Sequence, residues 1–377
     1  MKILELCEYS SGVCGVFNRV LAEAQLLSKK HSVIIYSSNL EKGTGKIAAS
    51  EQRVGNVDIK RFPVKWRIKE GTGGILFWDF KKSALELKPD IIITHNYRHP
   101  HNNQALKVAR KLQAKCFIVT HAPFVEQHLR SWKGNLGVFI YDSFFSRIKR
   151  FDKIIAITKW ELPYLEKLGI PKEKIIYIPN GVPTLFFKES IKLFKARNIL
   201  FFGRISPIKN LEILIKAYAE IKKRNNLVLL KIIGPEEPEY AKKMKELAAS
   251  LNLDILFLPP VNALKEKIKT IQEADIFALT SKREAMPQAL IEAMALGKVV
   301  ISSDNPGSKD IIEHEKNGFL FQRGNESDLA QEIMYCLDKR NNHKIKQIQK
   351  QARKAVEQFS WSSLIKKLEA LIGQKQE

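Results

Sequence analysis

The chain has few cysteines and no long apolar run. Its four cysteines, at positions 7, 14, 116 and 336, form no Cys-x-x-Cys pair, which argues against a disulfide framework and a structural zinc site. The longest stretch without Asp, Glu, Lys or Arg spans 13 residues, Ile175 to Phe187. A spanning helix needs about 20 mostly apolar residues, so we expect no transmembrane segment. Glu5 and Glu8 interrupt the start of the chain where a signal peptide is apolar, so we expect a cytoplasmic protein.

Acidic residues are also scarce relative to basic ones. The 377 residues include 63 Lys plus Arg and 40 Asp plus Glu, a formal charge of +23. Residues 1–185 carry 30 basic and 16 acidic side chains (+14), and the remainder carries 33 and 24 (+9). Such a surface attracts nucleic acid, anionic lipid or phosphorylated small molecules. A generally lysine-rich composition explains the same charge, and the two interpretations stand side by side.

Short apolar segments alternate with helical patterns in the first half, which predicts a parallel sheet covered on both faces. The expected strands are residues 2–6, 32–36, 90–94, 115–120 and 153–157. The expected helices are residues 16–27, 103–112 and 159–168.

The pattern restarts after a junction near residues 179–197. Strands are expected at residues 198–202, 228–233, 255–258 and 276–279, and helices at 210–223, 238–251 and 263–274. The sequence therefore predicts an α/β protein with two Rossmann-like domains facing a cleft. Ligands of such sheets bind beyond the carboxyl ends of the strands, so the residues just after each strand are the candidates for chemistry.

The segment after the strand at 198–202 has the composition of a diphosphate site. Gly203 permits close backbone approach, and Arg204 and Lys209 place two cations near the start of the helix at Asn210. Arg grips two phosphate oxygens at once, while Lys supplies a point charge. In so basic a chain, an ordinary surface Arg and Lys remain the alternative.

A second signal is the pair of acids Glu284 and Glu292. Pro287 suits the first position of a helix and Gly297 the position after its end, so Glu284 precedes the helix and Glu292 is its only charge. Burying an unpaired carboxylate costs several kcal/mol, so Glu292 needs a partner. A sugar diol is one candidate, and an internal Arg or Lys is the other.

These residues, in this order, resemble the retaining glycosyltransferases of family 4, which have the GT-B architecture. The resemblance covers nearly the whole chain. Its motifs are the glycine turn at 12–15, Ile178-Pro179-Asn180-Gly181-Val182, Gly203-Arg204 with Lys209, Glu284 through Glu292, residues 297–304 and 317–320, and Phe359-Ser360-Trp361.

The resemblance implies domains, donor contacts and a mechanism. An acceptor-binding domain would span residues 1–185 and a nucleotide-sugar domain residues 186–358, with a terminal helix at 359–377 crossing back to the first domain. The implied catalytic residues are His121, Arg204, Lys209 and Glu284. The implied donor-binding residues are Gly12, Gly15, Gly203, Arg204, Lys209, Glu284, Gln288, Ala289 and Glu292.

Within these sets the resemblance gives particular roles. Arg204 and Lys209 would neutralise the leaving diphosphate, Glu292 would bind the donor ribose, and Glu284 would contact the transferred sugar. His121 would lie near that sugar. The implied donor is a nucleotide diphosphate sugar with a hexose-type sugar, used with retention and without metal or cofactor, and no Asp-x-Asp occurs in the sequence. The acceptor would be a glycan, lipid-linked or membrane-proximal molecule, as in polysaccharide biosynthesis.

Three departures from the family pattern stand out. Pro183 follows Asn180-Gly181-Val182 where the family commonly has Asp, and Met286 replaces a frequent phenylalanine. The loop at 258–261 reads Leu-Pro-Pro-Val and does not end in glycine, which puts the identity of the nucleobase in doubt.

Two further groups of residues are candidates for binding. Histidines at positions 95, 99, 101, 121 and 128 have irregular spacing, which favours loop residues over a metal site, and His95 is a candidate for the acceptor pocket. Basic and aromatic residues interleave at 60–78 and at 127–153. They suit either an interface with anionic lipid or a helix whose aromatics pack in the core.

Two rival functions belong to other classes. A nicotinamide-dependent oxidoreductase needs Gly-x-Gly-x-x-Gly after its first strand and an acid after its second, and residues 11–16 and 36–38 supply neither. A nucleic-acid-binding protein without transferase activity explains the charge but leaves Glu284 and Glu292 without a purpose, so we expect no nucleic-acid partner.

Overall fold

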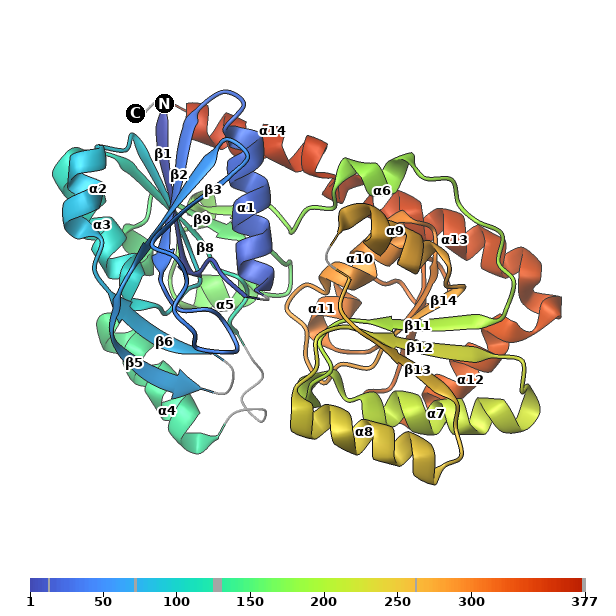
Figure 1. The fold of residues 1–377 in the computed structure, drawn as a ribbon. Helices are drawn as coiled ribbons and strands as arrows, with labels where there is room; N and C mark the ends of the chain where they lie inside the picture. Colours follow the sequence, from blue (N-terminus) through green and yellow to red (C-terminus); the bar gives the residue numbers. More distant parts are fainter. Residues whose placement is uncertain (13, 71–72, 125–130, 262, 375–377) are drawn as a thin grey trace. The chain divides into compact units, whose positions relative to one another are not determined.

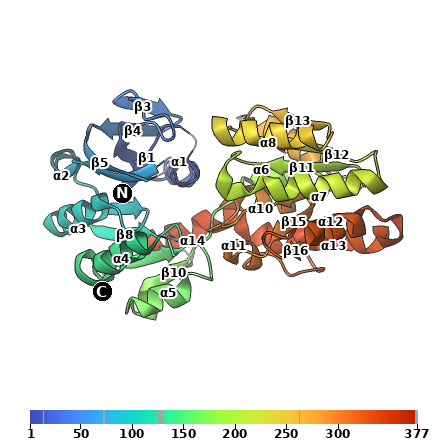
Figure 2. The ribbon, with the colours of Figure 1, turned by 90° about the horizontal axis from the view of Figure 1, so that it is seen from below.

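The structure is a computed structural model that describes residues 1–12, 14–70, 73–124, 131–261 and 263–374. The chain divides into two compact units, one formed by Met1–Asn180 with the segment from Leu364 onward, the other by Gly181–Ser363. Each unit is an α/β structure built on a parallel sheet, which confirms the predicted fold class. Figures 1 and 2 show helices on both sides of the strands in each unit.

The first unit contains an eight-stranded sheet of order β10-β9-β8-β7-β1-β2-β4-β3. Its neighbouring strands are parallel except β3 and β4. The strands are β1 (Lys2–Tyr9), β2 (Ser32–Ser38), β3 (Glu51–Val54), β4 (Val57–Phe62), β7 (Ile91–His95), β8 (Lys115–Val119), β9 (Lys153–Ala156) and β10 (Ile175–Tyr177). A separate antiparallel hairpin pairs β5 (Val64–Glu70) with β6 (Gly73–Trp78).

Helices cover both faces of this sheet. Figure 1 shows α1 on one side and α2 and α3 on the other. The helices are α1 (Gly15–Leu27), α2 (Lys81–Leu87), α3 (Pro100–Leu112), α4 (Trp132–Ile140) and α5 (Leu162–Lys167), with single turns η2 (Tyr141–Phe145), η3 (Ile148–Arg150) and η4 (Lys172–Lys174). Because both faces are covered, the central strands are continuous apolar runs, and every residue of β7 is buried.

The second unit contains a six-stranded parallel sheet of order β13-β12-β11-β14-β15-β16. Its strands are β11 (Asn198–Phe202), β12 (Leu229–Ile233), β13 (Ile255–Leu258), β14 (Ile276–Leu279), β15 (Val299–Ser303) and β16 (Phe319–Phe321). The order reverses between β11 and β14, and such a switch point is where open parallel sheets bind ligands.

The helices of the second unit also lie on both faces, with α7 and α8 on one side of the sheet and α9, α10 and α13 on the other (Figure 1). They are α6 (Thr184–Lys188), η5 (Pro207–Lys209), α7 (Leu211–Arg224), α8 (Pro238–Ser250), α9 (Leu264–Gln272), α10 (Gln288–Ala295), α11 (Pro306–Lys309), α12 (Glu326–Leu337), η6 (Lys339–Asn341), α13 (Asn342–Val356) and η7 (Glu357–Phe359). The last helix, α14 (Trp361–Gly373), begins in the second unit and ends in the first.

Two glycines of the second unit allow segments to approach closely. A Cβ on Gly181 would lie 2.2 Å from the Trp361 ring, so the start of the unit packs against its end. A Cβ on Gly234, whose φ is +152°, would lie 1.9 Å from the Gly203 carbonyl oxygen. The loops after β11 and β12 therefore meet backbone to backbone at the carboxyl ends of these neighbouring strands.

No helix in the described part of the chain combines the length and the apolar character that a membrane span requires.

Candidate functional site

Gly203, in the loop after β11, lies where the surrounding packing would also admit a residue with a Cβ. A Cβ there would meet only the Phe201 ring at 3.5 Å, an ordinary contact, and its φ is not in the left-handed region. The same holds for Gly15 at the start of α1, where a Cβ would meet nothing within 4 Å. Gly12 differs, because its φ is +79° and a Cβ would lie 2.5 Å from the Lys42 carbonyl oxygen. The fold itself requires Gly12 but not Gly15 or Gly203.

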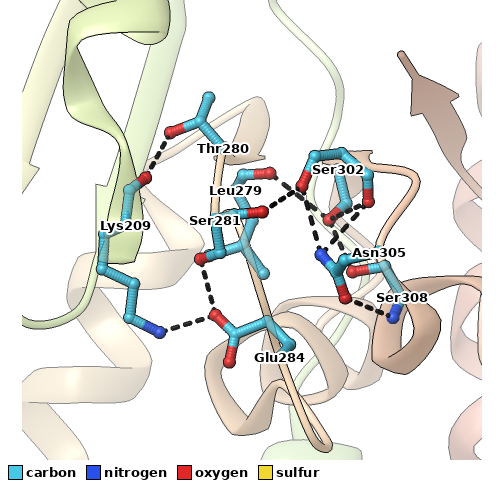
Figure 3. A network of polar contacts seen from close by, with 9 residues as sticks. Lys209, Leu279, Thr280, Ser281, Glu284, Ser302, Asn305 and Ser308 are labelled. Carbon is cyan, nitrogen blue, oxygen red and sulfur yellow. Dashed lines mark hydrogen bonds and ion pairs between the residues drawn. The ribbon is translucent and has the colours of Figure 1, made fainter. Parts of the chain in front are cut away.

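Lys209 and Glu284 come together as an ion pair at the switch point (Figure 3). The ammonium of Lys209, at the end of η5, lies 2.6 Å from Glu284 Oε1, and their side chains are 21% and 12% exposed. The Ser281 hydroxyl donates to the same oxygen at 2.6 Å. The Thr280 hydroxyl donates to the Lys209 carbonyl at 2.8 Å, which ties η5 to the end of β14. The structure thus brings together two residues that the sequence placed 75 positions apart.

A group of hydrogen-bonded polar residues at the end of β15 and at the start of α11 packs against the loop that carries Glu284. The Ser303 hydroxyl donates to the Ser281 carbonyl at 2.6 Å, and the Asn305 side chain caps α11 by accepting from the Ser308 amide at 3.0 Å. A Cβ on Gly307 would lie 2.7 Å from the Glu284 carbonyl, so α11 packs directly under the loop (Figure 3). Sequence analysis missed these residues, because the serines resemble ordinary strand-end polar residues and only their pairing reveals the group.

Arg204 lies beside a different acid. Its Nη1 is 3.9 Å from Glu237 Oε1, at the start of α8, and both side chains are partly exposed. Arg204 and Lys209 thus pair with different acids, and the convergence of the two cations on one phosphate stays a prediction. The helix expected near Asn210 does begin at Leu211.

Glu292 has a cationic partner inside the chain. The Lys267 ammonium, from α9, lies 2.5 Å from Glu292 Oε2, and the Gln288 amide donates to Oε1 at 3.3 Å. Of the two partners that the sequence left open, the internal lysine is therefore the one present. The Lys267 ammonium offsets part of the cost of burying the carboxylate, but Oε2 has no hydrogen bond of good geometry among the described residues. The ribose role of Glu292 stays a prediction from the family resemblance. Nothing in the sequence distinguishes Lys267 from its neighbours Lys265 and Lys269.

The start of α10 carries the remaining predicted donor contacts. The helix begins at Gln288, one residue later than expected, so Pro287 is the N-cap residue and not the first residue of the helix. The Gln288 side chain donates to the Gly181 carbonyl at 2.9 Å. The amides of Gln288 and Ala289 are among the first N-H groups of the helix, which lack carbonyl partners within it and suit an anion or a hydroxyl.

In the first unit, His121 follows β8 and is half-buried, with its Nε2 3.0 Å from His95 Nδ1. The other nitrogen of His95 lies 2.8 Å from Glu5 Oε2. Burial lowers the pKa of His95 to about 4 and that of His121 well below its ordinary value, so both rings are neutral. His95 is fully buried, so it does not line a pocket for an acceptor.

Glu5, Glu23 and His95 form the one group among the described residues whose ligand atoms gather closely enough for a metal, within 4.8 Å of one another. Arg19 lies in the same place, with its guanidinium 2.7 Å from Glu23 Oε1. A metal ion here would be repelled by the Arg19 guanidinium, and it would have to displace Glu5 from the His95 nitrogen. We therefore interpret the group as a hydrogen-bonded network of protonatable side chains and not as a metal site. His128, Val13 and Arg130, which figured in the sequence motifs, lie outside the described residues.

The two basic and aromatic stretches of the first unit behave differently. In the first, Phe62 and Trp78 are buried and stack at 5.8 Å, so they belong to the core, whereas Trp66 and Ile68 of β5 are exposed. The second forms α4 and η2, neither of which contains a buried residue. Trp132 is 71% exposed, Phe139 64% and Phe144 77%. The core-packed alternative therefore does not hold for Trp132, Phe139 and Phe144. It does hold for Tyr141 of η2, which packs against the core, and for Ile148 and Phe151 later in the stretch, which belong to it.

Comparison with known proteins shows the family. Residues 13–185 match the model of Glycosyltransferase Family 4, and residues 185–355 match that of Glycosyl transferases group 1. The chain belongs to the group 1 glycosyltransferases of family 4.

Relatives and solved structures agree with this family. An uncharacterised glycosyltransferase of Methanocaldococcus jannaschii is 24% identical over 90% of this chain and 88% of its own length. A putative colanic acid biosynthesis glycosyltransferase of Escherichia coli is 28% identical over 55% of this chain and 53% of its own. A Campylobacter jejuni N-acetylgalactosaminyltransferase named for a diphospho-undecaprenol substrate is 23% identical over 55% and 57%.

The chain spans about half the length of several of the curated relatives it matches. The crystal structure of Anabaena HepE in complex with UDP and glucose has a TM-score of 0.75, with 18% identity over 99% of each chain. That likeness shows the fold, and it agrees with the predicted GT-B class.

Proposed function

We propose that this glycosyltransferase transfers a hexose-type sugar, with retention, from a nucleotide diphosphate sugar to a glycan or lipid-linked acceptor. The observation that carries the proposal is the Lys209 and Glu284 pair on its serine-supported loop at the switch point. In the ligand-free chain Glu284 holds the Lys209 ammonium in place. A diphosphate would take over that ammonium, and Glu284 would then accept hydrogen bonds from hydroxyls of the transferred sugar.

In this mechanism the positive side chains act on the leaving group. The bond between the anomeric carbon and the phosphate oxygen breaks with its electron pair on the phosphate, where Lys209 and Arg204 neutralise the charge. The acceptor oxygen forms the new bond on the same face, and its proton passes to the leaving phosphate. Gly203 and Gly15, which the fold itself does not require, would let a phosphate approach the backbone.

The proposed donor contacts of Glu292 must be compatible with Lys267. A carboxylate has about four lone-pair sites, so it can bind an ammonium and still accept from a ribose diol. The amides at the start of α10 would bind a phosphate or sugar oxygen. His121 would contact the donor sugar. The donor class is supported by HepE, whose structure holds UDP and glucose, and the lipid-linked acceptor by the name of the Campylobacter jejuni relative.

We also propose that α4 and η2 bind an anionic membrane surface, which would place the protein at the inner face of the plasma membrane. Their large apolar side chains are exposed, and Lys133, Arg147 and Lys149 lie among or just after them. Apolar groups enter the headgroup region while the cations attract anionic lipid. No observation favours nucleic acid as a partner.

The donor assignment is tested with two variants in the full chain. A thermal-shift screen of nucleotide sugars identifies the donor, and release of the nucleoside diphosphate then measures turnover. We expect Lys209→Ala and Glu292→Ala each to lower kcat/KM by about 100-fold or more, because each loses a contact to the donor.

The matched control is Lys242→Ala, whose ammonium lies on the exposed face of α8. It should turn over normally. Unchanged turnover in Lys209→Ala or in Glu292→Ala, with the melting temperature retained, would refute the site assignment. Glu292→Ala leaves the Lys267 ammonium without any acceptor at this position. Glu292→Gln, whose amide oxygen can still accept from that ammonium, is therefore measured beside it and is expected to fold normally while losing activity.

A further inference from the structure

Three residues of the first unit, one within a strand and two at or just after strand ends, form a continuous hydrogen-bonded chain. Glu5 in β1 contacts Nε2 of His95 at the end of β7, at 2.8 Å. Nδ1 of His95 contacts Nε2 of His121, after β8, at 3.0 Å. Glu5 and His95 are fully buried, and His121 alone of the three is partly exposed. The proposed transfer mechanism uses His121 but assigns nothing to the two residues behind it.

The backbone fixes the outer end of this chain at an energetic cost. His121 has a φ of +57° and Ala122 a φ of +48°, the left-handed region that is unfavourable for a residue with a Cβ. The preceding residue is tethered, because the Tyr97 amide donates to the Thr120 carbonyl at 3.2 Å. Strain of this kind persists where the surrounding structure imposes a side-chain position. The imidazole of His121 is therefore directed onto His95 by the fold.

Each contact along the chain needs one hydrogen, and this couples the protonation of all three groups. If Glu5 is protonated, it donates to His95 Nε2, and His95 donates from Nδ1 to His121 Nε2. The proton of the neutral His121 ring is then on Nδ1. If Glu5 is ionised, every donor reverses: His95 donates from Nε2, and His121 donates from Nε2 and has a bare Nδ1. One proton on Glu5 thus decides what the other nitrogen of His121 can do.

We propose that Glu5 and His95 are positioning residues which hold His121 as its Nδ1-H tautomer, so that this nitrogen donates a hydrogen bond to an oxygen of the donor substrate. The proposal rests on the proposed function in its assignment of His121 to the donor. Ionisation of Glu5 releases one proton to solvent and leaves each imidazole neutral with its proton on the other nitrogen. No oxidant, reductant or metal takes part.

The surroundings of Glu5 favour its neutral form. Its charged and titratable neighbours are Arg19 and Glu23 from α1 and His95 from β7. Arg19 pairs with Glu23 at 2.7 Å and donates to the Ile178 carbonyl at 3.0 Å, so its charge is shared. Glu5 Oε1 has no hydrogen-bond partner among the described residues, which is cheaper for a neutral acid than for a carboxylate. Burial raises the pKa of Glu5 to about 8, and Arg19 opposes this.

The surroundings of His121 disfavour the protonated, charged form of its ring. Burial is the main reason that its pKa is low, and His95, Arg19, Lys42 and His99 each add to the effect. The ring therefore changes tautomer without gaining a charge, and the change follows Glu5. Buried carboxylic acids kept neutral in this way act as hydrogen-bond donors in other active sites.

The experiment is a two-bond 1H-15N correlation spectrum of the full chain with 15N-labelled histidine, which distinguishes Nδ1-H from Nε2-H rings. Signals are assigned with His95→Gln and His121→Gln. At pH 6.5 we expect both rings as Nδ1-H. At pH 9.5 both should be Nε2-H in the wild type. In Glu5→Gln the amide N-H2 still donates to His95, so Nδ1-H should persist at both pH values.

The matched control is Glu8→Gln, which lies on the same strand but whose carboxylate contacts His99 at 2.9 Å. It should show the wild-type change of tautomer. Nε2-H on His121 at pH 6.5, or the same pH-dependent change in the wild type and Glu5→Gln, would overturn the proposal. If Glu5→Gln does not fold, the wild-type spectra at the two pH values decide alone.

Turnover separates this inference from the proposed function. As pH rises from 7 to 9.5, kcat of the wild type should fall by roughly tenfold more than kcat of Glu5→Gln. If the tautomers behave as proposed but His121→Gln transfers sugar at the wild-type rate, the donor role of His121 is wrong while the positioning of its ring stands. If His121→Gln is inactive and the tautomers do not respond to Glu5, the positioning is wrong and the donor role stands.

Discussion

Single glycines separate what the fold requires from what a ligand would require. Gly234 has a φ of +152° and no room for a Cβ, whereas Gly203 has an ordinary φ and a Cβ there would meet only a ring at 3.5 Å. We expect Gly234→Ala to lower the free energy of unfolding of the second unit by about 3 kcal/mol or more, since backbone must move. Gly203→Ala should change it by less than about 1 kcal/mol and should weaken donor binding.

Urea unfolding and nucleotide titration measure these two effects. Gly203→Ala serves as the control for Gly234→Ala in stability, because both add one methyl group beside the same backbone. Normal donor binding by a folded Gly203→Ala would show that no phosphate approaches this backbone.

Glu161 gives a pH dependence of stability whose sign is fixed. It is buried and accepts from the Thr120 hydroxyl at 2.6 Å and from the Ile157 amide at 2.6 Å. Burial raises its pKa from 4.5 to about 7, although these hydrogen bonds oppose the shift. The folded state therefore binds this proton more tightly than the unfolded chain. The resulting stability is fully present below pH 4.5 and is lost as pH rises through about 7.

The variant Glu161→Gln has no ionisable group at this position, so its stability lacks this pH dependence. Between pH 4.5 and 8 its free energy of unfolding should fall by on the order of 2 kcal/mol less than that of the wild type. Urea unfolding at several pH values measures the difference. Contributions of other groups, including Glu5, occur in both proteins and cancel. Parallel pH profiles for the two proteins would contradict the elevated pKa.

At the scale of elements, α4 and η2 carry the membrane proposal. Replacing Trp132, Phe139 and Phe144 with serine should change the free energy of unfolding by less than about 1 kcal/mol, since these side chains are exposed. The triple variant should no longer sediment with phosphatidylglycerol vesicles at low salt, whereas the wild type should sediment and be released at high salt.

The control for this loss is Leu227→Ser, an exposed apolar residue of the second unit. Its sedimentation should equal that of the wild type. Equal sedimentation of wild type and triple variant would remove α4 and η2 from the membrane proposal, and indifference to vesicle charge would remove the membrane proposal itself.

The elements also show what sequence patterns capture. β11, β13 and β14 begin and end where the sequence predicted, because each is a short apolar run. β14 is buried throughout, whereas β13 lies at the edge of the sheet and is partly exposed. No strand was predicted at β3, β4, β5, β6, β10, β15 or β16. Charged residues interrupt the apolar pattern of β3, β4 and β5, and β10 and β16 are only three residues long.

Lys209 follows β11 and Glu284 follows β14, so their positions after strand ends predicted that both would lie at the same edge of the sheet. The Lys267 partner of Glu292 was one of several equivalent lysines, and only packing of α9 against α10 could select it.

The whole molecule carries a formal charge of +23, so binding tests with anionic ligands must separate specific binding from general attraction to the surface. Polyanions bind such a surface without specificity, and ionic strength weakens exposed contacts more than buried ones. Donor binding at the partly buried Lys209 should therefore persist at a salt concentration that releases the protein from vesicles. Binding that disappears at the same salt concentration as vesicle association would point to a surface effect.

Calorimetric titration of the full chain at high salt, with the nucleoside diphosphate and the nucleoside monophosphate of the base that the thermal-shift screen identifies, tests the central claim most directly. The account predicts that the wild type binds the diphosphate at least about tenfold more tightly than the monophosphate, because Lys209 and Arg204 contact the second phosphate. Lys209→Met, which keeps most of the side-chain length without the charge, should lose most of that preference. Equal affinity of the wild type for the two nucleotides, or an undiminished preference in Lys209→Met, would contradict the account.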